Sequence, residues 1–325
     1  MLVRRRLLLA LAASAFPLPA SAQQKKMFVI GYLAPIVPPD PRLDAFKQGM
    51  RDLGYIEGRD YRLEVRWGEG KLERMPALAV EMVKLKPDVI VARSSPSVLA
   101  LKKATSTIPI VMPVSSDPVG DGIVASLARP GGNITGLSQM APELAAKRLQ
   151  LLHDVIAKRS GRVSVLWNPA YTGMAARFRE TKVAGPNMGM DVRSVEIRDA
   201  REMEAAFEAI TRDPPMALVL LVDPLTYSMR ARIVEFARER RIPTIYETRD
   251  FADAGGLISY GPNTDAQYRR AAYFVDRILK GAKPGDLPIE QPVKIELVVN
   301  RATARTLGIA IPQSILSTAD QVIDN

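Results

Sequence analysis

The 325-residue chain contains no cysteine, a single histidine and no long apolar run beyond its first 22 residues. Without cysteine, disulfides, thiolate metal sites, a cysteine nucleophile and a lipid on an N-terminal cysteine are all excluded. With one histidine, a familiar metal site would need several carboxylates, and none cluster at ligand spacing. We therefore expect no metal and no cofactor, and no membrane helix after the N-terminal segment.

Common enzyme motifs are missing as well. The sequence holds no Gly-x-Ser-x-Gly elbow and no Gly-x-Gly-x-x-Gly fingerprint. The glycine-rich segment 129–133 lacks the lysine and the following hydroxyl of a P-loop. His153 lies in a helix-like segment, where a surface or packing role is favoured over catalysis. The chain is therefore predicted not to be an enzyme, and an exported α/β hydrolase is disfavoured.

The formal charge is +10, and removal of the first 22 residues, which carry three arginines and no acid, would leave +7. Such an excess can indicate a nucleic-acid or anionic-membrane partner. Here the basic residues are dispersed and mixed with acids, as in the segment 230–240, and no aromatic residues alternate with a basic patch. The pattern indicates a solvated basic surface, so we expect no nucleic-acid partner.

The N-terminus has the three parts of an export signal. Arg4–Arg6 form a positive start, residues 7–16 an apolar stretch too short to span a bilayer, and Ala20-Ser21-Ala22 a small-residue cleavage site. We predict a signal peptide over 1–22, cut after Ala22. Together with the missing cysteine, this favours a freely diffusing protein of a Gram-negative periplasm.

Strand-like and helix-like segments alternate through the rest of the chain. Strand-like patterns are predicted at 27–33, 61–67, 88–92, 108–112, 163–167, 192–197, 217–222, 244–246, 257–260 and 293–299. In 61–67 apolar residues alternate with charged ones, which indicates a strand near the edge of a sheet. Helical patterns between them imply parallel sheets with right-handed crossovers. The Gly/Pro/Asn-rich stretch 116–138 separates two such sets, and about three hundred residues exceed one ordinary core. The sequence therefore predicts an α/β fold with two lobes.

In open α/β sheets a ligand lies beyond the carboxyl ends of the strands. This rule selects small hydroxyls, acids, an amide and two aromatic rings as ligand-binding candidates. They are Tyr32, Ser94, Ser95, Ser116, Asp117, Asn168, Asp223, Glu247 and Tyr260.

Several candidates admit two interpretations. Ser94-Ser95-Pro96 begins a predicted helix whose free N–H groups could hold a carboxylate, or it is an ordinary N-cap. Asp117 and Asp223 each precede a proline, so each could accept a ligand ammonium or fix a turn or helix start. Glu247 is either a solvent-facing acid or a ligand contact.

The remaining candidates are equally open. Tyr32 and Tyr260 could stack on a ligand or fill the space between lobes. Asn168 could bind the ligand or hold its own turn.

The chain resembles the substrate-binding proteins of a bacterial ABC transporter family whose characterised members bind tryptophan, tyrosine or phenylalanine. The resemblance depends on the order and spacing of many pieces across nearly the whole exported chain. These pieces are 53–59, 116–138, 147–152, 165–169, 242–244, 255–261 and 307–312.

The resemblance implies a type I periplasmic-binding-protein fold, with two Rossmann-like lobes joined by several hinge crossings. We expect lobe 1 to comprise 23–137 plus about 262–290, and lobe 2 to comprise 138–261 plus about 291–325. The implied role is to bind a small solute (an amino acid or similar carboxylate or amide) between the lobes and to deliver it, as a monomer, to an inner-membrane ABC permease. An alternative is a sensor subunit that presents ligand to a membrane kinase or chemoreceptor.

One departure from the family pattern concerns the ligand. Where relatives often have a Thr-Pro pair after the third strand, this chain has Ser95-Pro96, with Arg93 just before it. Arg93 could place a cation near the pocket, so aromatic amino-acid specificity does not transfer directly.

Overall fold

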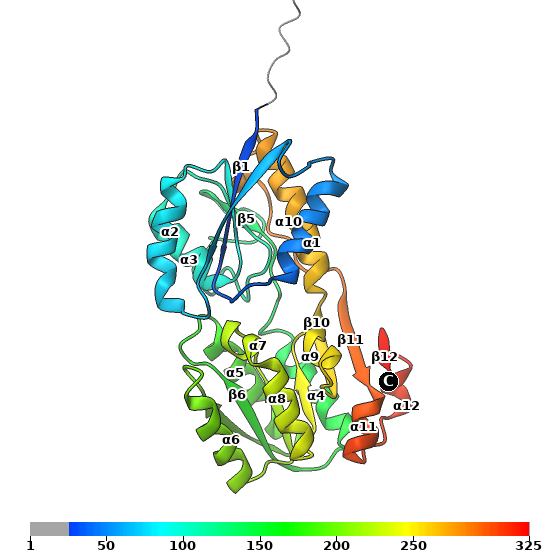
Figure 1. Cartoon of the computed structure of the whole chain (residues 1–325). Coiled ribbons are helices and arrows are strands. Elements are labelled where there is room, and N and C mark those ends of the chain that lie inside the picture. Colours follow the sequence, from blue (N-terminus) through cyan, green and yellow to red (C-terminus); the bar gives the residue numbers. More distant parts are fainter. Residues whose placement is uncertain (1–25, 325) are drawn as a thin grey trace, which may run out of the picture.

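Two lobes, each built on a mainly parallel sheet, lie one above the other in Figure 1. The computed structural model describes residues 26–324, so the predicted signal peptide and its cut after Ala22 lie outside the described residues. Within this range no helix is both long enough and apolar enough to cross a bilayer. The predicted α/β class and bilobal architecture are confirmed.

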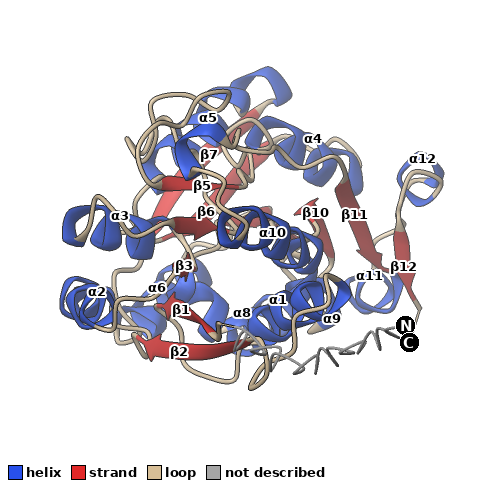
Figure 2. Cartoon of the chain, turned by 90° about the horizontal axis from the view of Figure 1, so that it is seen from above, coloured by secondary structure: helices blue, strands red, loops and turns tan. Residues whose placement is uncertain are grey.

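The first lobe has a five-stranded parallel sheet. Its strand order is β2 (Tyr61–Trp67), β1 (Phe28–Ala34), β3 (Val89–Ala92), β4 (Ile110–Met112) and β5 (Ile134–Gly136). Its helices are α1 (Pro41–Asp52), η1 (Leu72–Arg74), α2 (Met75–Lys84), α3 (Ser95–Ala104), α10 (Thr264–Leu279) and η3 (Pro284–Asp286). Helices α1 and α10 pack together over one face, while α2 and α3 cover the other (Figure 2).

Alternation along the buried strands explains this sandwich. In β3, Val89 and Val91 enter the core under α1 and α10, whereas Ile90 and Ala92 enter the core under α2 and α3. Successive strand side chains point to opposite faces, and both faces are covered by helices, so the strand is apolar throughout. The alternating charged strand 61–67 is β2, at the edge of the sheet, as its pattern predicts.

The second lobe has seven strands, ordered β12 (Gln321–Ile323), β11 (Ile295–Asn300), β10 (Ile258–Pro262), β9 (Thr244–Tyr246), β8 (Ala217–Leu220), β6 (Gly161–Trp167) and β7 (Met190–Glu196). Its helices are α4 (Ala145–Val155), α5 (Met174–Ala184), η2 (Pro186–Met188), α6 (Glu202–Arg212), α7 (Pro224–Ser228), α8 (Arg230–Glu239), α9 (Arg249–Asp253), α11 (Arg301–Leu307) and α12 (Gln313–Leu316). Only β10 and β11 pair antiparallel among the described strands. Helices α4 and α5 pack on one face of this sheet, and α6 and α8 on the other.

The chain passes between the lobes three times. It leaves β5 for α4, returns from β10 to α10, and leaves again after η3 to form β11. Several crossings of this kind were predicted, and these connections run between the two lobes in Figure 1. The exact lobe bounds depend on where the hinges bend, and they stay a prediction.

Two local predictions differ from the structure. The stretch 116–138 was expected to be a crossing alone, but its residues 134–136 form β5, which pairs with β4. This strand has a single apolar residue, Ile134, followed by Thr135 and Gly136, so no apolar run marks it in the sequence. The apolar pattern of 225–238 predicts a single helix, but the structure has two, since α7 ends at Ser228 and α8 begins at Arg230.

Candidate functional site

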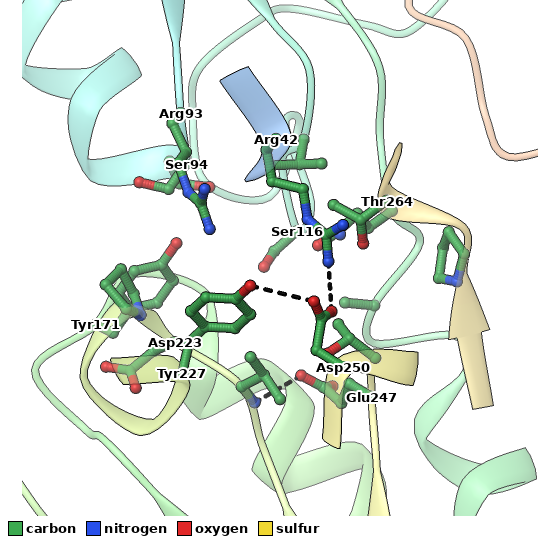
Figure 3. A pocket seen from close by; sticks show the side chains of 18 of the residues that line it. Arg42, Arg93, Ser94, Ser116, Tyr171, Asp223, Tyr227, Glu247, Asp250 and Thr264 are labelled. Carbon is green, nitrogen blue, oxygen red and sulfur yellow. Dashed lines mark hydrogen bonds and ion pairs between the residues drawn. The ribbon is translucent and has the colours of Figure 1, made fainter. Parts of the chain in front are cut away.

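A cavity lies between the two lobes, at the ends of their strands (Figure 3). Its volume is about 90 Å³, several times what one water needs. Lobe 1 supplies residues that follow β3 and β4 or belong to α1 and α10, and lobe 2 supplies residues around α5, α7 and α9. The charged and tyrosine residues in its lining are Arg42, Arg93, Arg148, Arg177, Asp223, Glu247, Asp250, Tyr171, Tyr227 and Tyr268.

On the lobe 2 side, Glu247 follows β9 directly and holds two buried arginines. Its Oε1 accepts a hydrogen bond from Arg148 Nη1 at 2.9 Å, and its Oε2 accepts one from Arg177 Nη1 at 2.8 Å. Oε2 also accepts from the Val222 N–H at 2.8 Å. Burial, the largest cause, and the neighbouring Arg177 lower the pKa of Arg148, while Glu247 raises it. Glu247 is therefore the counter-ion that allows two guanidiniums to be buried here.

On the lobe 1 side, Asp40 is the counter-ion of Arg93. Asp40 is buried, pairs with Arg93 Nη1, and accepts from Tyr32 Oη at 2.6 Å. Arg42, on the same side of the cleft, pairs with Asp265 of α10 and with Asp250 of α9. Four guanidiniums thus reach one small space, each with a carboxylate partner.

Asp223 begins helix α7 beside the cavity. Its Oδ1 accepts from Thr226 N at 2.8 Å, completing a capping box, and its Oδ2 accepts from Asn168 Nδ2 at 2.7 Å. Burial is the main cause that raises the pKa of Asp223, and hydrogen bonds from Thr226 and Asn168 oppose it. A ligand cation near this carboxylate would therefore be stabilised.

Helix α3 begins at the cavity with an unusual residue. Ser94 has φ 82° and ψ 154°, a backbone conformation that residues other than glycine rarely adopt. Holding a serine in it costs about 1–3 kcal/mol of folding free energy. Its Oγ makes no capping hydrogen bond, so the simple N-cap interpretation of this serine is not what the structure shows. The Oγ of Ser95 donates instead to Asp121 Oδ2 at 2.9 Å. Such strain is typical of positions that serve a binding site.

Many polar atoms in the lining have no partner in the protein. Eight buried side-chain atoms are unpaired among the described residues, and five of them belong to the lining: Ser94 Oγ, Ser116 Oγ, Arg177 Nε, Thr248 Oγ1 and Tyr268 Oη. Buried polar groups are normally hydrogen-bonded, so such a concentration indicates a place where a ligand or water completes the bonding.

The lobes touch each other around this cavity. Arg42 of lobe 1 pairs with Asp250 of lobe 2, and Asp250 also accepts from Tyr227 Oη at 3.1 Å. A Cβ placed on Gly173 of lobe 2 would lie only 3.3 Å from the Cβ of Ser116 in lobe 1. Gly173 also has φ 82°, which favours glycine. These contacts describe a closed arrangement of the two lobes.

Five of the nine candidates from the sequence line the cavity: Ser94, Ser95, Ser116, Asp223 and Glu247. The other four lie outside the lining. Tyr32 is fully buried inside lobe 1, Asn168 lies behind Asp223, and Tyr260 contributes its carbonyl oxygen to Arg148 Nε at 2.8 Å. Asp117 Oδ1 accepts from Gly120 N at 2.8 Å, which is the turn role weighed for it.

The sequence rule missed most of the charged lining. Arg93 follows β3 directly and was noted as a cation, but it was not among the candidates. Arg148 and Arg177 lie on helices, where the sequence gives no sign that their partner is Glu247, 99 and 70 residues away. Asp250 and Tyr227 were missed because they lie on short helices a few residues beyond the strand ends.

The place of Asp117 gives a first prediction. The Asp117→Ala variant should lose about 0.5–2 kcal/mol of stability, as for the loss of a capping side chain, and should bind its solute within about twofold of the wild type. Chemical unfolding and calorimetric titration would measure the two quantities. A large loss of affinity at unchanged stability would show instead that Asp117 holds the ligand.

Residues 40–323 match the sequence profile of a family described as ABC transporter substrate binding protein. A tyrosine-binding protein of Clostridioides difficile (strain R20291) is 25% identical over 273 residues, which are 83% of this chain and 78% of that protein. A crystal structure from Streptococcus pneumoniae, described as an ABC domain in complex with L-Trp, is 25% identical, covers 92% of this chain and 100% of its own, and has a TM-score of 0.83. A conserved domain protein from Vibrio cholerae has 26% identity, a TM-score of 0.84 and coverage of 91% and 100%.

Proposed function

The chain belongs to the ABC transporter substrate-binding protein family, and we propose that it binds an amino acid or a similar small carboxylate or amide in the cleft between its lobes. Proteins of this family bind small solutes and deliver them to the permease of an ABC transporter, and the family and its structural neighbours are binding proteins, not enzymes. We propose that the chain delivers its solute to a permease and does not present it to a sensor, because the family is defined by its part in transport.

The observation that carries the proposal is the cavity at the strand ends of both lobes, with five unpaired polar atoms in its lining. A solute held there would contact both lobes at once and would be removed from water on closure. The relatives named for tyrosine and L-Trp support an amino acid or related carboxylate as the class of solute. The predicted ligand-binding roles of Ser94, Ser116 and Asp223 remain part of this proposal.

The family is typically extracytoplasmic, and we propose the periplasm as the location. The predicted signal peptide over 1–22, with its cut after Ala22, supports this location. We further propose that the exported protein is a monomer that docks on its inner-membrane permease when the lobes are closed, since closure joins surfaces of both lobes into one.

A ligand screen tests the proposal. A true solute should raise the melting temperature, because binding at a hundredfold excess over Kd adds about 2.7 kcal/mol to the free energy of unfolding. The same solute should shrink the radius of gyration in small-angle scattering, because it favours the closed arrangement. A wide panel of amino acids, carboxylates, amides and sugars with no stabilising member would contradict the proposed function.

A further inference from the structure

Arg93 lines the cleft on its lobe 1 side. It follows β3 directly, and Figure 3 shows its guanidinium reaching from lobe 1 into the space above Tyr227. Its side chain is 11% exposed, and its Nη1 donates to Asp40. Because a guanidinium carries five N–H donors, this one bond leaves most of them available to the cavity.

The guanidinium also lies over two tyrosine rings of the lining. Its central carbon is 5.4 Å from the ring centre of Tyr227 and 5.9 Å from that of Tyr268. A second arginine, Arg230, lies 4.9 Å from the Tyr227 ring centre. These distances are typical of cation–π contacts. Two of the three tyrosines in the lining are therefore already in contact with cations, and an aromatic solute would have to displace Arg93 to stack on them.

The unpaired atoms around the cavity favour a particular kind of solute. Arg177 Nε can only donate, and the other four unpaired lining atoms are hydroxyl oxygens, which can donate. The lining carboxylates already accept bonds from the protein: Glu247 from two arginines, Asp250 from Arg42 and Tyr227, and Asp223 from Thr226 and Asn168. Every unpaired atom of the lining can therefore donate, and the group that matches several donors best is an anionic oxygen.

We infer that Arg93 determines the class of solute: it excludes aromatic side chains from the rings of Tyr227 and Tyr268, and its free N–H groups bind an anionic oxygen of a non-aromatic carboxylate. This inference rests on the proposed function, since it concerns the solute of the same cleft. It separates this chain from the relatives named for tyrosine and L-Trp, although the fold is shared.

Calorimetric titration of the purified protein with L-glutamate, L-aspartate, succinate, L-tyrosine and L-tryptophan tests the inference. We expect at least one non-aromatic carboxylate to bind, and to bind at least tenfold more tightly than either aromatic amino acid. The Arg93→Met variant keeps an unbranched, mostly apolar stem and removes the charge and the N–H donors. It should bind that carboxylate at least tenfold more weakly than the wild type does. The ratio of its Kd for an aromatic amino acid to its Kd for the carboxylate should therefore fall, to one or below if the preference is reversed.

Two further variants make the result specific. Arg93→Lys keeps the charge but not the planar fork, and it should retain part of the carboxylate affinity while folding as the wild type does. The control is Arg270→Ala, which removes a similar contact, 3.8 Å from guanidinium carbon to the ring centre of Tyr273, at a partly exposed position outside the cavity. It should leave every affinity unchanged.

The outcomes are distinguishable. If the wild type binds tryptophan or tyrosine more tightly than the carboxylates, the inference is wrong and the receptor function stands. If Arg93→Met folds but keeps the wild-type preference, the inference is wrong as well. If neither these compounds nor the wider panel bind, the proposed function fails and this inference fails with it. If Arg93→Met does not fold, the inference is tested by two other measurements. These are the wild-type preference for a non-aromatic carboxylate over the aromatic amino acids, and the carboxylate affinity that Arg93→Lys retains.

Discussion

The Glu247→Ala variant should lose about 3–5 kcal/mol of its free energy of unfolding, a large fraction of the stability of an ordinary domain. The substitution leaves Arg148 and Arg177, whose side chains are 3% and 4% exposed, without their shared carboxylate. Two like charges would then remain buried near each other. Urea unfolding monitored by circular dichroism would measure the loss of free energy, and lobe 2 should be the lobe that is destabilised.

A matched control separates this effect from the ordinary loss of an ion pair. Glu180 lies 3.7 Å from Arg179 Nε, with both side chains well exposed, so Glu180→Ala should change stability by about 1 kcal/mol or less. The alternative interpretation of Glu247, as a residue that mainly contacts ligand, gives a different result. In that case Glu247→Ala would weaken solute binding while the free energy of unfolding stayed near that of the wild type.

The fold was predictable because it depends on short-range pattern. Apolar four-residue runs such as β3 and β8 are buried on both faces, so their sequences are apolar throughout and identify parallel strands. The short strands β5 (Ile-Thr-Gly) and β12 (Gln-Val-Ile) were missed because a glycine ends one and a glutamine begins the other, so neither is marked by a continuous apolar run. The direction of β11, which pairs antiparallel with β10, depends on where the last crossing returns to lobe 2. No local sequence pattern predicts that direction.

The site was predictable only in part, for a related reason. Ser94, Ser116 and Glu247 come within a few residues of a strand end, and the position of a strand end in a sheet is set by the fold. Tyr32 lies outside the lining because β1 continues to Ala34, and the alternation of the strand then turns Tyr32 into the core. The arginines on helices could not be found, because a buried arginine and a surface arginine have the same sequence pattern until the partner carboxylate is located.

The Asp250→Asn variant should bind its solute about 10- to 100-fold more weakly than the wild type. Asp250 of lobe 2 pairs with Arg42 of lobe 1, and these side chains are 17% and 5% exposed. Opening the cleft separates the two groups, while Arg42 keeps its partner Asp265 within lobe 1. A charged hydrogen bond of this kind contributes about 1.5–3 kcal/mol, and here that free energy favours only the closed arrangement.

The weaker binding follows from the population of the closed form. The apparent Kd equals the intrinsic Kd divided by the fraction of molecules that are competent to bind, so a substitution that favours the open form raises it even if the substituted residue touches no solute. Scattering should therefore show a larger ligand-free radius of gyration for Asp250→Asn, and full compaction should require more solute. The control is Asp253→Asn on the same helix, whose partner Arg249 lies within lobe 2, so that closure leaves its ion pair unchanged. Equal affinities for Asp250→Asn and the wild type would show that the Arg42–Asp250 pair does not hold the lobes together, and that closure depends on the solute alone.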